Sequence, residues 1–411
     1  MTANRTAIWR SRSDTVEGRT FVVLGNPENR RVESFVRAFR RLGRGELRIL
    51  AWLDFIRDPA VLAYCLRSDG WLRIESPGEN FEVERAILFL GISDSDYRHE
   101  SRLSAGEIAE LRFENGRLLS LPQWYRGWRC VLDHVRESLE GVPGCRVMNS
   151  PGDIGVMFDK EQCHAIFTSR QVPTPALFGI PESYEDLRQM MEAHRCKRVF
   201  LKPCHSSSAS GVIAYEIGLA SQQAFSSVEI VRENGRVKLF NSLSIRRYNA
   251  SAEIAQLIDA VCREKSIAEA WFPKAGLEGQ RFDLRVLVIG GAAQHAVVRQ
   301  SAGPITNLHL GNRRGALEVL KQRMGSGNWQ AALTVCECAA AAFQDSLYVA
   351  VDLLVAPGFA RFAVAEVNAF GDLLPNLNFR GLDTYSAELA ALDFSPAAST
   401  ASANQVSRIG L

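Results

Sequence analysis

Residues 362–375 read FAVAEVNAFGDLLP, and this stretch decides how the C-terminal half of the chain is interpreted. The run begins as an apolar strand and then places Glu366 and Asn368 two positions apart. Side chains at positions i and i+2 of a strand point to the same face of a sheet. A buried carboxylate is costly unless a partner compensates its charge. The pattern therefore predicts a partner beside these two side chains.

A third oxygen donor precedes this strand. Asp352 follows mostly apolar residues in LYVAVDLL (347–354), and PGF at 357–359 predicts a turn between two strands. If the strands pair through this turn, Asp352 faces Glu366 and Asn368. Two carboxylates and a carboxamide suit Mg²⁺, which usually keeps further ligands from water and phosphate. The alternative is a hydrogen-bonded turn beside an unrelated aspartate.

A loop of small residues lies earlier, in FLKPCHSSSASGV (200–212). Lys202 closes an apolar strand, and the loop after it can expose backbone N–H groups to phosphate oxygens. A plain surface turn is the alternative. Cys204 and His205 are adjacent, which does not suit a nucleophile and its base.

Arginines follow in RFDLRVLVIGG (281–291) and in the segment after it. Asp283 and Arg285 share one strand face, so Arg285 either enters the same cleft or forms a salt bridge with Asp283. Arg299 and Asn307 come next, and a guanidinium group suits phosphate and carboxylate because it binds two oxygens.

The composition is that of an ordinary globular protein. The 411 residues include 48 basic and 46 acidic side chains, a net charge of +2, which gives no case for a nucleic-acid or membrane binder. Nine scattered cysteines argue against a disulfide framework, and Cys336 and Cys338 face apart on a predicted helix rather than binding a metal. Without a signal peptide or a long apolar run, we expect a cytoplasmic protein.

The N-terminal region alternates strands with helices, which predicts a parallel α/β sheet. We expect strands at 21–24, 47–56 and 85–96, and a helix whose buried face carries Val32, Phe35, Phe39 and Leu42, with its arginines on a solvated face. Ligands of such sheets bind beyond the carboxyl ends of the strands. That rule points to 25–26 and 91–94, although plain turns explain these residues equally well.

Seven motifs in this order resemble the ATP-grasp superfamily, and most of all its glutathione synthetase and ribosomal-protein glutamate ligase branch. The resemblance covers roughly residues 145–380. It rests on Lys160, FLKPCHSSSASGV, AEAWFP (268–273), FDLRVLVIGG, RQSAGPITNLHLGNRRG (299–315), VAVDLL and AEVNAF.

The resemblance implies a role for each matching residue. The phosphates of ATP would be held by Lys160, Lys202 and the loop residues Ser206, Ser207, Ser208 and Gly211. The adenine ring would meet the backbone around Ala270 and Trp271, with Glu269 assisting. Mg²⁺, as two ions, would be bound by Asp352, Glu366 and Asn368. The transferred phosphate and the substrate carboxylate would be steadied by Arg285, Arg299 and Asn307.

The chain departs from its relatives in two places. The phosphate loop carries serines where relatives have more glycine. After Asn368 the sequence runs through Phe370, Gly371 and Asp372 where relatives often have Pro-Gly. No residue is an obvious ribose ligand, and Glu278 is the nearest candidate.

The expected architecture is an ATP-grasp fold of the α/β (α+β) class, preceded by a parallel-sheet α/β domain. We place a flexible N-terminus at 1–19, the preceding domain at 20–145, the two ATP-grasp subdomains at 146–270 and 271–395, and a disordered tail at 396–411. The expected activity is ligation of a small-molecule or peptide carboxylate to an amine through an acyl phosphate, by a monomer or a homodimer. A kinase acting on a hydroxyl group and a non-catalytic nucleotide-binding protein are the alternatives.

Overall fold

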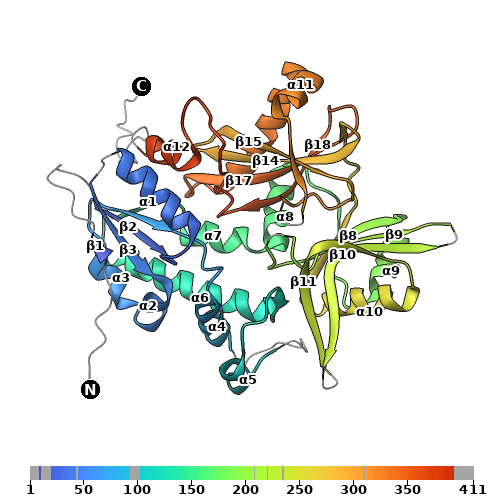
Figure 1. The fold of residues 1–411 in the computed structure, drawn as a ribbon, viewed down its shortest axis with the longest axis horizontal. Coiled ribbons are helices and arrows are strands. Elements are labelled where there is room, and N and C mark those ends of the chain that lie inside the picture. Colours follow the sequence, from blue (N-terminus) through green and yellow to red (C-terminus); the bar gives the residue numbers. More distant parts are fainter. Residues whose placement is uncertain are drawn as a thin grey trace, which may run out of the picture.

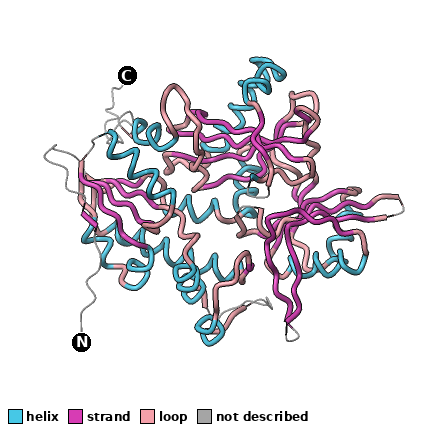
Figure 2. Tube along the Cα trace, viewed as in Figure 1, coloured by secondary structure: helices cyan, strands magenta, loops and turns pink. Residues whose placement is uncertain are grey.

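The computed structural model describes residues 9–10, 20–42, 45–92, 102–207, 209–219, 221–233, 236–308 and 311–392. Three β-sheets with covering helices make up this part of the chain (Figure 1, Figure 2). The predicted tail after 396 and most of the N-terminal 19 residues lie outside it. Among the described helices, none has the length and apolar character needed to cross a membrane.

The first sheet is parallel, as predicted, except for one short edge strand. Its order is β1-β3-β2-β4-β6, and only β1 is antiparallel to its neighbour. The strands are β1 (Trp9–Arg10), β2 (Thr20–Gly25), β3 (Glu46–Ala51), β4 (Trp71–Ile74) and β6 (Arg146–Val147).

Helices cover both faces of this sheet. They are α1 (Arg30–Leu42), α2 (Trp52–Arg57), α3 (Ala60–Cys65), α4 (Phe81–Leu90) and α6 (Leu121–Glu140). The short helix α5 (Ala105–Glu110) packs on α4 instead. Alternate residues of β2 enter two different cores, because Val23 packs with Phe35 of α1 while Leu24 packs with Trp128 of α6. The predicted core face of α1 is buried except for Leu42, which is 36% exposed.

Two predicted strands need correction. The strand predicted from residue 47 ends at Ala51, where α2 begins, and the segment predicted as a strand from residue 85 belongs to α4. Asn80 starts α4 by accepting a hydrogen bond from the Val83 N–H, which favours the helix. The third inner strand is instead β4, a run of four buried residues.

Gly91, one of the predicted ligand positions, has a packing role. It ends α4 against α6, and a Cβ there would lie only 2.0 Å from the carbonyl oxygen of Gln123. Glycine is therefore required for the close approach of two helices. The rest of that predicted position, from residue 93, lies outside the described residues.

The second sheet is antiparallel, with the order β5-β11-β10-β9-β8-β12-β7. Two helices, α9 (Tyr184–Ala193) and α10 (Ser251–Cys262), pack on the face that carries Val199 and Leu201. Its strands are β5 (Arg117–Leu118), β7 (Leu177–Gly179), β8 (Arg198–Pro203), β9 (Ile213–Ile217), β10 (Gln222–Glu233), β11 (Arg236–Tyr248) and β12 (Ser266–Ala270). Because side chains alternate along β8, Phe200 and Lys202 project from the opposite face.

The third sheet is also antiparallel and has the order β16-β15-β14-β17-β18, with β13 paired to β14. Its strands are β13 (Gly276–Leu277), β14 (Gln280–Ile289), β15 (Ala292–Ser301), β16 (Arg313–Gly315), β17 (Tyr348–Val355) and β18 (Phe362–Asn368). The long helix α11 (Leu317–Ala340) packs on it. On α11, Cys336 is buried and Cys338 is exposed, so the two thiols face apart as predicted. The connecting helices are α7 (Pro151–Met157) and α8 (Lys160–Ser169).

The C-terminal segment returns to the first sheet. Helix α12 (Thr384–Ala391) packs against α1, beside which it lies in Figure 1. Between them the fully buried guanidinium group of Arg73 forms ion pairs with Glu75 (2.6 Å), Glu388 (2.6 Å) and Asp372 (2.5 Å). The helix arginines are therefore not all solvated, because Arg31 also reaches Asp372, at 2.8 Å.

We expect Arg73→Leu to be strongly destabilising, because it leaves three buried carboxylates with too little positive charge. Breaking a buried ion pair typically costs about 3–5 kcal/mol. Urea unfolding with linear extrapolation measures the loss. Arg136→Leu is the matched control, since Arg136 and its acidic partners are about half exposed and solvent screens these ion pairs, so little change in stability is expected. Equal unfolding midpoints for the two variants would contradict the prediction.

Candidate functional site

The oxygen donors predicted on β17 and β18 lie side by side. The two strands pair antiparallel, with Asp352 opposite Glu366 and Ala350 opposite Asn368. The register shifts just beyond the Asp352–Glu366 pair, so β18 contains a bulge there. Bulges commonly re-aim side chains beside functional sites. The amide Nδ2 of Asn368 lies 3.4 Å from Oε1 of Glu366, so the three side chains form one group.

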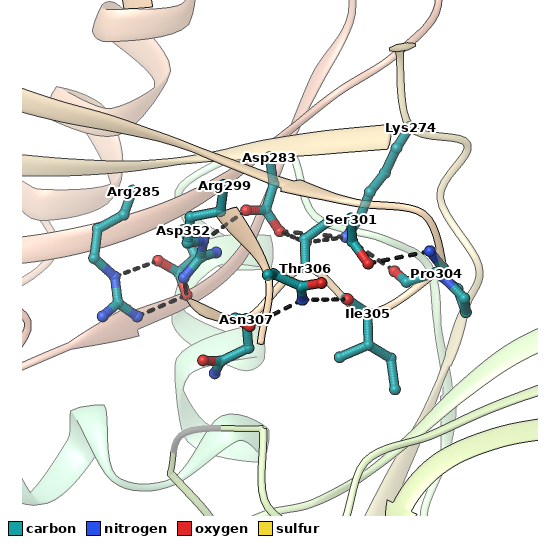
Figure 3. Close-up of polar contacts among 12 residues, drawn as sticks. Lys274, Asp283, Arg285, Arg299, Ser301, Pro304, Ile305, Thr306, Asn307 and Asp352 are labelled. Atoms are coloured by element: carbon teal, nitrogen blue, oxygen red, sulfur yellow. Dashed lines mark hydrogen bonds and ion pairs between the residues drawn. The ribbon is translucent and has the colours of Figure 1, made fainter. Parts of the chain in front are cut away.

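Asp352 is held by two arginines (Figure 3). Its carboxylate accepts hydrogen bonds from Arg285 at 2.8 and 2.9 Å and from Nη1 of Arg299 at 3.0 Å. Burial raises the pKa of Asp352, but the two guanidinium groups lower it by more, so the net pKa lies below its ordinary value. The carboxylate therefore stays ionised inside the protein.

Beyond Asp352, the network continues through side chains of alternating charge. Nε of Arg299 donates to Asp283 at 2.7 Å, and Lys274 donates to the same carboxylate at 3.2 Å and to the Thr306 hydroxyl at 2.6 Å. Figure 3 shows this chain running from Arg285 to Lys274. The alternative salt bridge within one strand, Arg285 with Asp283, is not formed, because each arginine finds its carboxylate on a neighbouring strand.

The donor set fits Mg²⁺ in chemistry. Among the described residues, no three His, Cys, Asp or Glu side chains cluster in a way that would hold a metal. The candidate site instead combines two carboxylates, which lie close enough to interact, with the oxygen of Asn368. Mg²⁺ commonly takes one or two carboxylates and completes its coordination with water and phosphate, so this set is sufficient.

The two lysines of the site come from different elements. Lys202 on β8 forms an ion pair with Glu269 on β12, and both side chains are nearly buried. Lys160 is the first residue of α8, where the Asp159 side chain caps the helix, and its Nζ donates to the carbonyl oxygen of Ser206 at 2.5 Å. Lys160 thus supports the loop that follows β8.

The predicted phosphate loop divides into cavity-lining and structural residues. Ser206 and Ser207 line a cavity, whereas Ser208 lies outside the described residues. Gly211 has a φ of +77°, and a Cβ there would lie 2.6 Å from Cγ of Pro203, so it serves the turn. His205 stacks on the Tyr125 ring at 4.0 Å, and burial lowers its pKa to about 4. Burial also raises the pKa of the Cys204 thiol to about 12, which fits the prediction that these two do not catalyse.

The predicted adenine hinge follows β12. The N–H of Ala270 donates to the Ala176 oxygen at 2.8 Å, and the N–H of Trp271 donates to the Arg198 oxygen at 3.1 Å. Both amide hydrogens therefore serve the protein itself. Trp271 packs beside Phe200, with ring centroids 5.1 Å apart. The neighbouring Phe272 lines a cavity, and the sequence interpretation missed it.

Most of the predicted site residues surround two adjoining cavities. A smaller cavity of 90 Å³ between the second and third sheets is lined by Lys202, Arg299 and Asp352, among others. A larger cavity of 430 Å³ contains Lys160, Arg285 and Asn368 and extends to the first sheet. Three predicted residues, Glu269, Asn307 and Glu366, line both. Gly211, Ala270 and Trp271 line neither.

The smaller cavity also has walls that sequence reasoning missed. Phe200, Phe272 and Leu354 supply apolar surface, and Lys274 and Thr306 add polar groups. Leu354 follows Asp352 by two positions on β17, and the period of a strand could have identified it. Lys274 gave no local signal, because its partners Asp283 and Thr306 are set by the tertiary fold.

The comparison with known proteins gives a fold. No protein-family profile matches the sequence, and no curated protein matches it either. The crystal structure of D-cycloserine synthetase DcsG has 11% identity and a TM-score of 0.51, over 90% of this chain and 98% of that one. The chain has the ATP-grasp fold. This likeness confirms the expected fold class.

Two further solved structures are similar to this chain, with lower TM-scores. The ATP-grasp ligase PsnB, complexed with precursor peptide PsnA2 and AMPPNP, has 16% identity and a TM-score of 0.46, over 93% of this chain and 99% of that one. A RiPP-associated ATP-grasp ligase of Chryseobacterium gregarium has 12% identity and a TM-score of 0.46, over 92% and 98%.

The two arginines on Asp352 should differ in their effect on stability. Arg299 is 8% exposed and binds two carboxylates, whereas Arg285 is 21% exposed and binds one. We expect Arg299→Leu to cost about 3–5 kcal/mol and Arg285→Leu clearly less, since solvent screens the second pair. Chemical denaturation of both variants tests this order, and a larger loss for Arg285→Leu would contradict it.

Proposed function

We propose that the protein is an ATP- and Mg²⁺-dependent ligase that joins a carboxylate to an amine. The observation that carries the proposal is the pair of adjoining cavities that share Glu269, Asn307 and Glu366. The smaller cavity, with apolar walls and a lysine, suits the base of a nucleotide, and the adjoining larger cavity of 430 Å³ leaves space for the phosphates and the further reactants.

Each group has a role in this proposal. Phe200, Phe272 and Leu354 pack against the base, and Lys160 and Lys202 bind phosphate oxygens by charged hydrogen bonds. Asp352, Glu366 and Asn368 would hold Mg²⁺, as a pair of ions that neutralise phosphate charge when bound. Arg285, which lines the larger cavity, and Asn307, which lines both, orient the substrate carboxylate toward the γ-phosphate.

Arg299 has a different role from the one that the resemblance implied. Its Nε and Nη1 atoms already donate to Asp283 and Asp352, and its side chain is 8% exposed. We assign it as a positioning residue that fixes Asp352.

The reaction has two steps. A carboxylate oxygen takes the γ-phosphoryl group, which gives an acyl phosphate and ADP. The lone pair of an amine then forms a C–N bond to the acyl carbon, the C–O bond to phosphate breaks with its electron pair, and the departing phosphate takes one proton from nitrogen. Positioning and electrostatic stabilisation account for the rate, so no protein nucleophile is required.

Trapping with hydroxylamine tests the reaction class. The full chain is incubated with ATP, Mg²⁺ and hydroxylamine and a panel of the twenty protein amino acids and common dicarboxylic acids, and products are weighed by mass spectrometry. We expect a hydroxamate, because this small nucleophile intercepts an acyl phosphate. A stable phosphate ester without hydroxamate would indicate a kinase instead, and nucleotide binding without any turnover would indicate a binding protein.

Glu366→Gln should weaken the dependence of ATP binding on Mg²⁺ and abolish turnover. The substitution keeps the shape and removes one charge from the donor set. A charged hydrogen bond contributes about 1.5–3 kcal/mol, and we expect a loss of this size in the affinity for a non-hydrolysable ATP analogue with Mg²⁺ present. Calorimetric titration with and without Mg²⁺ measures it. Glu318→Gln, on the exposed side of α11, is the control. Wild-type affinity in Glu366→Gln would remove Glu366 from the metal site.

A further inference from the structure

The larger cavity reaches the first sheet where the order of its strands changes direction. The chain passes from β2 through α1 to β3 on one side, while β4 lies on the other side of β2. The segments after these strands, 29–31 and 76–79, both line the cavity. Crevices at such switch points, beyond the carboxyl ends of the strands, bind ligands in α/β proteins. The first sheet therefore contributes a subsite remote from the base-binding walls.

One carboxylate in this crevice lacks a cationic partner. Within the part of the chain that the structure describes, Glu84 of α4 forms no ion pair, although it lines the cavity. Its Oε1 faces the backbone of Gly78, 3.6 Å from where a Cβ on Gly78 would stand. The indole N–H of Trp124 is buried without a hydrogen bond of normal geometry, but it lies close enough to Glu84 to lower the pKa of that carboxyl group. Burial raises the pKa of Glu84 to about 7, and Trp124 offsets this only in part.

The other acidic groups near the crevice have different surroundings. Glu79 is exposed to solvent and accepts a hydrogen bond from Nδ2 of Asn29 at 3.1 Å, and Asp372 forms ion pairs with both Arg31 and Arg73. An uncompensated carboxylate in a cavity costs free energy that the fold does not recover. Its presence there points to a ligand that brings the positive charge.

Aromatic rings surround the same place. Trp124 stacks on Phe158 with centroids 5.9 Å apart, and Phe158 meets Phe370 edge-on at 5.8 Å. All three residues line the cavity. Aromatic faces attract cations within about 6 Å and also cover apolar groups. A carboxylate next to such a wall is complementary to an ammonium group on a small apolar body.

We propose that Glu84 binds the protonated amine of the nucleophilic substrate, against the wall formed by Trp124, Phe158 and Phe370. This inference rests on the proposed function, because it assigns the second substrate of the ligase. Before attack, the ammonium must lose one proton, and the Glu84 carboxylate takes it, which leaves a neutral amine and a carboxylic acid. Glu84 is then a catalytic residue contributed by the first sheet's domain.

Calorimetry with small amines tests the subsite on the full chain, with a non-hydrolysable ATP analogue and Mg²⁺ present. The probes are ethylammonium, alaninamide and N-acetylalaninamide. We expect the two cations to bind and the acetylated, uncharged probe to bind at least about tenfold more weakly. Glu84→Gln should weaken the binding of alaninamide about tenfold to a hundredfold, as expected for loss of a charged hydrogen bond.

Glu82→Gln is the matched control, because Glu82 lies on the exposed side of the same helix and pairs with Arg85. It should bind alaninamide as the wild type does. Glu84→Gln should keep or raise the melting temperature, since it removes an uncompensated charge. A large fall in melting temperature would mean that Glu84 has a structural partner, and unchanged alaninamide affinity would mean that it does not bind amines. Either result overturns the proposal.

Failure of this inference can be told apart from failure of the proposed function. If the ATP analogue binds and neither cation does, the amine subsite is wrong and the ligase proposal stands. If the cations bind through Glu84 but no ATP analogue binds, the ligase proposal is wrong and the ammonium site stands. Alanine compared with alaninamide identifies the source of the amine. If alanine binds more tightly than alaninamide, and Arg30→Ala removes that advantage, the substrate is an amino acid whose carboxylate meets Arg30, an exposed residue that lines the cavity. If the two probes bind equally, the substrate is an amine without a neighbouring carboxylate.

Discussion

The buried carboxylate of Asp352 is the group on which the candidate site depends. It joins three neighbouring strands, because its partners Arg285 and Arg299 stand on β14 and β15. Burying any one of these charges alone would cost several kcal/mol, roughly, and the cost is recovered only when opposite charges meet with good geometry. Asp283 and Lys274 continue the alternation, so each charge has neighbours of opposite sign. Such a chain resists rearrangement and holds the site in place before any ligand arrives.

A second buried cluster fixes the other side of the larger cavity. Arg73 on β4 ties the first sheet to Asp372 and Glu388 from the C-terminal segment. Only three residues separate Asn368 from Asp372, and among them Gly371 is required, since a Cβ there would lie 2.2 Å from Cβ of Ala350. Asp372 anchors the end of β18 to the first sheet and so fixes the distance between the oxygen donors of β17 and β18 and the crevice.

Local periodicity determined which parts of this arrangement could be predicted. The pairing of Asp352 with Glu366 follows from a strand period and a turn, and both signals lie within a few residues. The segment at 85–90 was assigned wrongly, because a short apolar run fits a buried strand and a buried helix equally well. One of the two alternatives for Arg285, a salt bridge with Asp283 on its own strand, is wrong, because Arg285 pairs with Asp352 on the neighbouring strand β17. Glu84 gave no signal in the sequence, because its lack of a cationic partner is a property of the tertiary structure.

The charges around the smaller cavity, where the proposed function places the base of ATP, bear on the number of metal ions in the proposed reaction. The charged residues that line the smaller cavity are three cations and four anions. Lys160 and Arg285, which line the adjoining larger cavity and are assigned to the phosphates and the substrate carboxylate, bring the sum to +1. ATP adds about four negative charges, and Mg²⁺ ions at the phosphates neutralise them. Two ions leave a net charge of about +1, which one substrate carboxylate cancels. A single ion would leave about one uncompensated negative charge before the substrate carboxylate enters and about two afterwards, and like charges close together in a low dielectric repel strongly. The pair of ions is therefore the electrostatically consistent form of the proposal. The unpaired Glu84 lies outside this balance, at the first-sheet end of the larger cavity, where an ammonium group would neutralise it.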